Sequence, residues 1–146
     1  MLRMHKSVMD EIQAHMMEIY PHECCGLIIG TTGGIAAGDV RTGVRSWRCG
    51  NLNTERAVDR YELDPKDMLR AQQELDGSDN DIVGIYHSHP DHPSRASEFD
   101  RDHAWPGWSY MIGSVMKGQI DSVQSWVLDP SGARFQEESV EVEEEK

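Results

Sequence analysis

An apolar run that ends in two histidines constrains the fold of this chain more than any other stretch. The run from Ile82 to Tyr86 is followed at once by His87, Ser88, His89 and Pro90. A short apolar run bounded by polar residues is typical of a strand buried on both faces of a sheet. Side chains two positions apart leave a strand on the same face, roughly 7 Å apart along the backbone. We therefore expect both imidazoles on one face, at a strand end that the proline terminates.

The segment after the histidines offers a third polar side chain to the same place. Ser97 to Asp100 predicts the start of a helix with Ser97 as its N-cap, which puts Asp100 in the first turn. Two imidazoles and one carboxylate, with a fourth position left to water, are a usual ligand set of catalytic zinc. Each half has an ordinary alternative, because S-x-x-D can be a capping box and strand-end histidines can be surface residues.

The joint spacing is far more specific than either half. His87-x-His89-Pro90, six residues, Ser97, two residues and Asp100 resembles, at every position, the signature of the JAMM (MPN-plus) metalloproteases. The resemblance implies that His87, His89 and Asp100 bind Zn²⁺ and that Ser97 helps to stabilise an oxyanion. It extends from about residue 8 to residue 128 and implies the JAMM fold, which is cytidine-deaminase-like.

An acidic residue upstream acquires a role through the same resemblance. Glu23 precedes Cys24, Cys25, Gly26 and an apolar run that predicts a buried strand. At such a junction an acidic side chain is usually solvated. A metal hydrolase, however, needs a base that takes a proton from water and returns it to the leaving amine. Glu-x-Cys-Gly resembles the family's upstream segment, which implies that Glu23 is this base.

The three cysteines, Cys24, Cys25 and Cys49, do not form a disulfide framework. The adjacent pair should face opposite sides of a strand start, so both cannot serve one site. Buried packing is the ordinary role of free cysteine. Three free thiols are typical of a reducing compartment, so we expect the cytoplasm.

Charge and hydropathy exclude two classes of partner. The net charge of −12 argues against nucleic acid, because phosphates would be repelled. No window approaches the ~20 apolar residues of a membrane span. Charged residues such as Arg3 and Lys6 stand where a signal peptide needs an apolar stretch.

The remaining patterns predict a single-domain α/β fold with a mixed β-sheet flanked by helices. We expect helices over 5–20 and from Asp64-Pro65 to Gly77, strands from Leu27, within 35–50 and over 108–115, and a hairpin of 119–128 with 133–135. The JAMM/MPN domain is expected over 1–136. The acidic run 137–146 is expected to be a disordered tail.

The resemblance implies a zinc-dependent metallopeptidase or isopeptidase. Compact members without the insertions of deubiquitinases act at the Gly-Gly C-terminus of ubiquitin-like or sulfur-carrier proteins, so such a protein is the expected partner. The alternative is a non-catalytic zinc-holding MPN-type protein-interaction domain. The intact motif argues against a metal-free scaffold, and the H-x-E and P-C-x-x-C motifs of a zinc deaminase are absent.

Overall fold

The computed structural model describes residues 1–32, 40–53, 61–96, 104, 107–129 and 134–144. In chain order its elements are β1 (Leu2–His5), α1 (Lys6–Ile19), β2 (Cys25–Thr32), β3 (Arg41–Cys49), α2 (Pro65–Leu75), β4 (Asp81–Pro90), β5 (Ser109–Met116), β6 (Gln119–Leu128), β7 (Phe135–Glu138) and β8 (Val140–Glu143). None of the helices in these ranges is long and apolar enough to cross a membrane.

The described strands form one mixed sheet in the order β7-β6-β5-β4-β2-β3-β1-β8. β4 lies inside the sheet, antiparallel to β2 and parallel to β5. Nearly every residue of β4 is buried, as expected for a strand covered on both faces. The predicted α/β architecture with a mixed sheet is therefore confirmed, and the histidines lie at the end of an interior strand.

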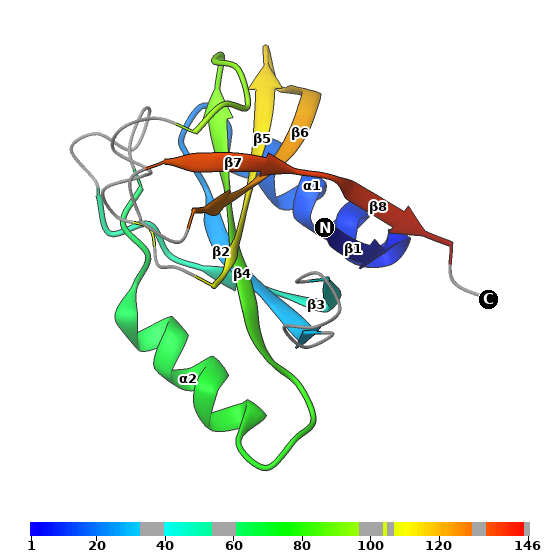
Figure 1. Cartoon of the computed structure of the whole chain (residues 1–146). Coiled ribbons are helices and arrows are strands. Elements are labelled where there is room, and N and C mark those ends of the chain that lie inside the picture. Colours follow the sequence, from blue (N-terminus) through cyan, green and yellow to red (C-terminus); the bar gives the residue numbers. More distant parts are fainter. Residues whose placement is uncertain (33–39, 54–60, 97–103, 105–106, 130–133, 145–146) are drawn as a thin grey trace.

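The chain from β7 to β8 joins the two edges of this sheet. β7 pairs with β6 at one edge, and β8 pairs with β1 at the other, so the run crosses the molecule in Figure 1. Between them the carbonyl of Ser139 accepts a hydrogen bond of 2.9 Å from the Leu2 amide. The expectation of a disordered tail from residue 137 is thus wrong for residues 137–143.

Opposite charges explain why this acidic segment is ordered. Arg3 of β1 forms ion pairs with Glu141 at 3.5 Å and Glu143 at 3.1 Å. The Glu138 carboxylate lies 3.2 Å from the amino group of Met1 and accepts a 2.7 Å hydrogen bond from a serine of β6. β1 itself was not predicted, because its four residues pair only with distant parts of the chain.

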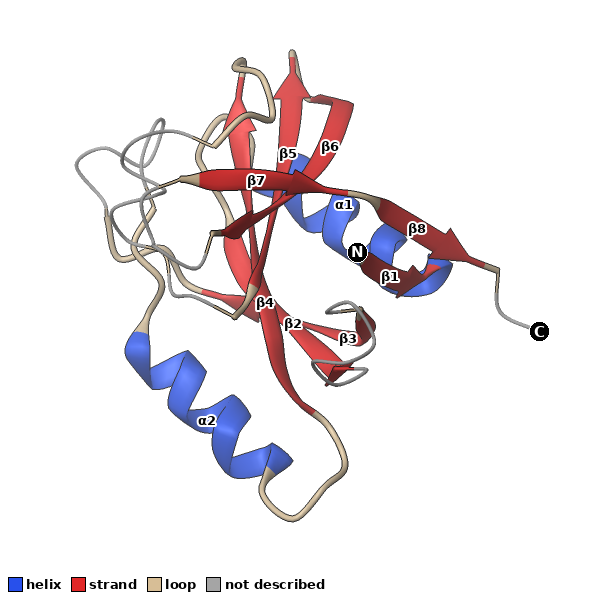
Figure 2. Cartoon of the chain, in the orientation of Figure 1, coloured by secondary structure: helices blue, strands red, loops and turns tan. Residues whose placement is uncertain are grey.

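Each helix covers its own hydrophobic core. Val8, Ile12 and Met16 of α1 belong to one buried cluster, as the spacing of its apolar residues predicts. Ala71 and Leu75 of α2 belong to the other. Figure 2 shows the helices on different sides of the strands, so the sheet is buried by two layers.

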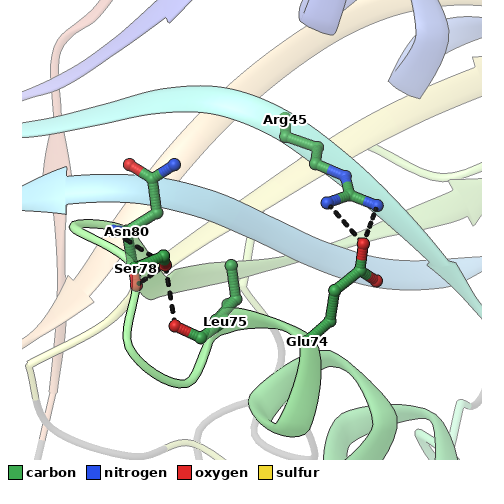
Figure 3. A network of polar contacts seen from close by, with 5 residues as sticks. All are labelled: Arg45, Glu74, Leu75, Ser78 and Asn80. Carbon is green, nitrogen blue, oxygen red and sulfur yellow. Dashed lines mark hydrogen bonds and ion pairs between the residues drawn. The ribbon is translucent and has the colours of Figure 1, made fainter.

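The ends of α2 follow the predicted signals. Asp64 caps the helix by accepting a 2.9 Å hydrogen bond from the Lys66 amide, and the chain turns at Gly77 with φ +81°. Figure 3 shows the far end of the helix, where Glu74 accepts two hydrogen bonds of 3.2 Å from Arg45 of β3. These contacts fasten α2 to the sheet beside the end of β4 that is remote from the histidines.

Candidate metal centre

Glu23, His87 and His89 converge at the end of β4. Their potential ligand atoms all lie within 4.8 Å of one another. The strand register explains the meeting, because Cys25 of β2 pairs with His87 and the residue two positions earlier then falls opposite His89. Glu23 and His87 are 2% and 0% exposed, so the cluster is largely shielded from water.

One ring nitrogen of His89 forms a hydrogen bond with the backbone. Its Nδ1 lies 2.8 Å from the carbonyl oxygen of Pro93. A carbonyl can only accept, so Nδ1 carries the hydrogen, and in the neutral ring Nε2 is the nitrogen that can act as a ligand. Metal-binding histidines usually have such a partner on the other nitrogen, which orients the ring and raises its basicity.

An aromatic ring covers His87. Tyr61 stacks on the imidazole with 4.3 Å between ring centroids and 23° between planes. Tyr61 is 7% exposed and precedes α2. The sequence does not predict this contact, since Tyr61 belongs to a run, Tyr61-Glu62-Leu63-Asp64-Pro65, that has only the pattern of a helix start.

Hydrogen bonds fix the backbone that directly follows Glu23. The Asn51 side chain donates to the Glu23 carbonyl at 3.1 Å. The next amide, that of Cys24, donates to the Ser88 hydroxyl at 2.9 Å, and the Ser88 amide donates back to the Cys24 carbonyl. The Ser88 side chain thus lies on the face of the sheet opposite the histidines. Asn51 offered no signal in the sequence, whereas strand alternation could have placed Ser88.

The predicted site residues Ser97 and Asp100 lie outside the described residues, as does His103. His92 is exposed, in the turn after β4, and its carbonyl accepts a hydrogen bond from Ser114.

The cysteines lie where the alternation predicted. Cys24 belongs to the core on one face of the sheet, and Cys25 and Cys49 belong to the core on the other. Burial raises the pKa of Cys24 and of Cys49 to about 12. Burial also raises the pKa of the Cys25 thiol. These thiols stay protonated near neutral pH and serve as core residues.

Two neutral imidazoles and a carboxylate suit a divalent metal ion that takes nitrogen and oxygen ligands. The orientation of His89 and the burial of His87 fit such an ion. A buried carboxylate beside them is also placed to exchange protons with anything held there.

Comparisons with known proteins agree with this reading. The family model for prokaryotic homologs of the JAB domain matches residues 5–129. A desampylase from Haloferax volcanii is 35% identical over 124 residues, 84% of this chain and 80% of that protein. A tail tip assembly protein K from Escherichia phage N15 is 33% identical over 98 residues, which are 67% of this chain but only 34% of that protein.

Two solved structures have the same architecture. A solution structure of a Desulfitobacterium hafniense protein has a TM-score of 0.84 and 29% identity, covering 99% of this chain and 94% of its own. A solution structure from Salinibacter ruber has a TM-score of 0.72 and 32% identity, covering 97% and 91%. With the paired histidines at the end of β4 and the match over residues 5–129, the chain belongs to the prokaryotic JAB-domain family, within the JAMM-type proteins.

Proposed function

We propose that this protein is a zinc metallopeptidase that hydrolyses an amide or isopeptide bond at the Gly-Gly C-terminus of a ubiquitin-like or sulfur-carrier protein. The observation that carries the proposal is the cluster of Glu23, His87 and His89, with ligand atoms within 4.8 Å and the Nδ1 of His89 held by a carbonyl. In this proposal His87, His89 and Asp100 hold the ion.

The chemistry that zinc supplies when bound is Lewis acidity, which lowers the pKa of a water molecule and polarises a carbonyl. Glu23 accepts the proton of the attacking water and delivers it to the departing amine nitrogen. Its burial and the hydrogen-bonded peptide group that follows it keep the carboxylate aimed at the cluster. Ser97 donates a hydrogen bond to the oxyanion.

The substrate class rests on similarity. The relative from Haloferax volcanii is named a desampylase, a name that describes removal of a ubiquitin-like modifier, and this chain covers 80% of its length. A Gly-Gly tail is narrow because it lacks side chains, so it can enter a site that excludes ordinary peptides. Recognition then depends on the folded body of the carrier, and the reaction takes place in the cytoplasm.

The test is cleavage of a carrier fusion. A ubiquitin-like carrier from the same source, extended after its Gly-Gly end, should be cut at that junction, while casein and unrelated short peptides stay intact. Replacing the last glycine of the carrier by valine should block cleavage. Efficient digestion of casein, or indifference to the valine, would refute the substrate claim. Zinc binding without any cleavage would favour the non-catalytic interaction domain instead.

A further inference from the structure

A dense set of hydrogen bonds holds the turn that follows β4. This turn, Asp91 to Ser94, presents three consecutive carbonyls, and each accepts a hydrogen bond from a side chain. The His92 carbonyl accepts from Ser114, the Pro93 carbonyl from His89, and the Ser94 carbonyl from the indole N–H of Trp126 at 3.0 Å.

The Ser94 side chain is held as firmly as its carbonyl. The residue is 1% exposed. Its hydroxyl lies 2.8 Å from the hydroxyl of Ser122 and donates to the side-chain oxygen of Gln124 at 2.7 Å. A buried hydroxyl with two such partners cannot move without leaving polar groups unpaired, which is costly.

Three of the residues that hold the turn, Ser114, Ser122 and Gln124, stand in the same cross-strand rows as the metal-site histidines. His89 pairs with Ser114, which pairs with Ser122. His87 pairs with an isoleucine of β5, which pairs with Gln124. Residues paired directly across strands share a face of the sheet. The turn therefore folds back over the face that carries the histidines, onto polar side chains placed one and two strands away.

We infer that five residues act together as positioning residues for His89. We call them the turn clamp: Ser94, Ser114, Ser122, Gln124 and Trp126. They fix the carbonyl of Pro93 at the place where it accepts the Nδ1 hydrogen. Through that hydrogen bond they set the tautomer and the orientation of the ring, so Nε2 faces the cluster. This inference rests on the proposed metal site and assigns to β5 and β6 a part in building it.

The turn clamp makes a prediction that mere support of the fold does not. If these side chains only stabilised the turn, their loss would lower overall stability and leave the His89 ring unchanged. If they position the Pro93 carbonyl, their loss frees the Nδ1 hydrogen bond. The ring then samples both tautomers and rotates. Metal binding must then also fix the tautomer and orientation of the ring, which lowers the metal affinity. Loss of such an outer partner typically lowers metal affinity 10- to 100-fold.

The experiment compares Trp126→Phe and Ser94→Ala with two matched controls. Trp126→Phe keeps an aromatic ring but removes the indole donor together with part of the side-chain volume, so its control must lose the same volume. Trp108→Phe is its control, because Trp108 packs against the same hydrophobic cluster. Ser125→Ala is the control for Ser94→Ala, since the Ser125 hydroxyl is also buried but donates to Glu138, the last residue of β7.

Two readouts are taken on each full-length protein. Long-range ¹H–¹⁵N NMR of the metal-free protein reports which ring nitrogen of His89 carries the hydrogen. Competition with a chromophoric chelator reports affinity for zinc. In the wild type and both controls we expect the Nδ1–H tautomer and zinc affinities within about threefold of one another. In each clamp variant we expect a mixture of tautomers and affinity lowered by about 10-fold or more.

The outcomes separate the inference from the proposed function. Clamp variants that fold, keep the Nδ1–H tautomer and bind zinc like the wild type overturn the inference and leave the proposed function standing. Controls that lose affinity as strongly as the clamp variants also overturn it. A wild type that binds no zinc refutes the proposed function, and with it the claim on metal affinity. If one variant fails to fold, the other decides the question, and Ser114→Ala provides a third.

Discussion

The buried pair of His15 and Tyr86 predicts that the protein loses stability as pH falls below about 6.5. His15 of α1 is 4% exposed, and its Nδ1 lies 2.6 Å from the Tyr86 hydroxyl. Burial, aided by the positive charge of Arg48 and opposed by Glu18, lowers the pKa of His15 to about 4. The imidazole is therefore neutral in the folded protein at physiological pH.

The sign and size of the effect follow from proton linkage. The unfolded chain binds a proton at His15 with a pKa of about 6.5, and the folded protein only near 4. Between these values the unfolded state holds more protons, so protonation favours unfolding. The contribution is complete above pH 6.5 and is lost progressively down to pH 4. A difference of about 2.5 pKa units corresponds to about 3 kcal/mol in total, most of it lost by pH 4.5.

His15→Asn provides the matched comparison. Asparagine can place a polar atom near the position of Nδ1, so contact with Tyr86 is possible, but it does not titrate. Urea unfolding of both proteins is measured at pH 7, 6, 5 and 4.5. Acidic groups common to both proteins cancel in the difference of unfolding free energies. We expect the wild type to lose about 2.5 kcal/mol more than the variant between pH 7 and 4.5. Parallel stability curves, within about 0.5 kcal/mol, would refute this reasoning.

Three further predictions concern the metal centre and the closure of the sheet. The double change His87→Ala and His89→Ala should abolish stoichiometric zinc binding measured by metal analysis, because two imidazoles supply half the coordination of a four-coordinate ion; full occupancy would exclude the site. Glu23→Gln should keep zinc and lower turnover of the carrier fusion by ~10²-fold or more, since the amide cannot accept the proton; loss of zinc would instead make Glu23 a ligand. Glu138→Ala should lower the free energy of unfolding by about 3 kcal/mol in urea titrations. The reason is that the largely buried Arg41 guanidinium, which lies 4.0 Å from the Glu138 carboxylate, loses this partner. The control Glu141→Ala removes an exposed ion pair and should lower the free energy of unfolding by under about 1 kcal/mol.

Local patterns were sufficient to predict the elements that build the centre. The apolar run before His87 predicted β4, and alternation predicted that the two histidines share a face. The helix start at Asp64-Pro65 and the hairpin of β6 with β7 were also predicted correctly. In each case the information is carried by residues close together in the sequence, so periodicity and turn chemistry identify it.

Contacts between distant segments could not be predicted in this way. Tyr61 meets His87 only because the chain before α2 returns to the sheet, and no pattern around the tyrosine encodes that path. The acidic run 137–146 has the composition of a solvated tail. Residues 137–143 nevertheless pair with β6 and β1, because Arg3 and the amino group of Met1 neutralise part of its charge.

The centre depends finally on the register between β2 and β4. A slip of one residue would turn Glu23 to the face opposite the histidines, because side chains alternate along a strand. Gly26 and Tyr86, which are direct partners in this register, oppose such a slip. A Cβ on Gly26 would lie 2.3 Å from the Tyr86 ring, so the ring can pack against residue 26 only because that residue is a glycine. Tyr86 then reaches His15 on the face away from the metal centre. The glycine of the Glu-x-Cys-Gly segment thus fixes, from one face of the sheet, the alignment that brings Glu23 and the histidines together on the other.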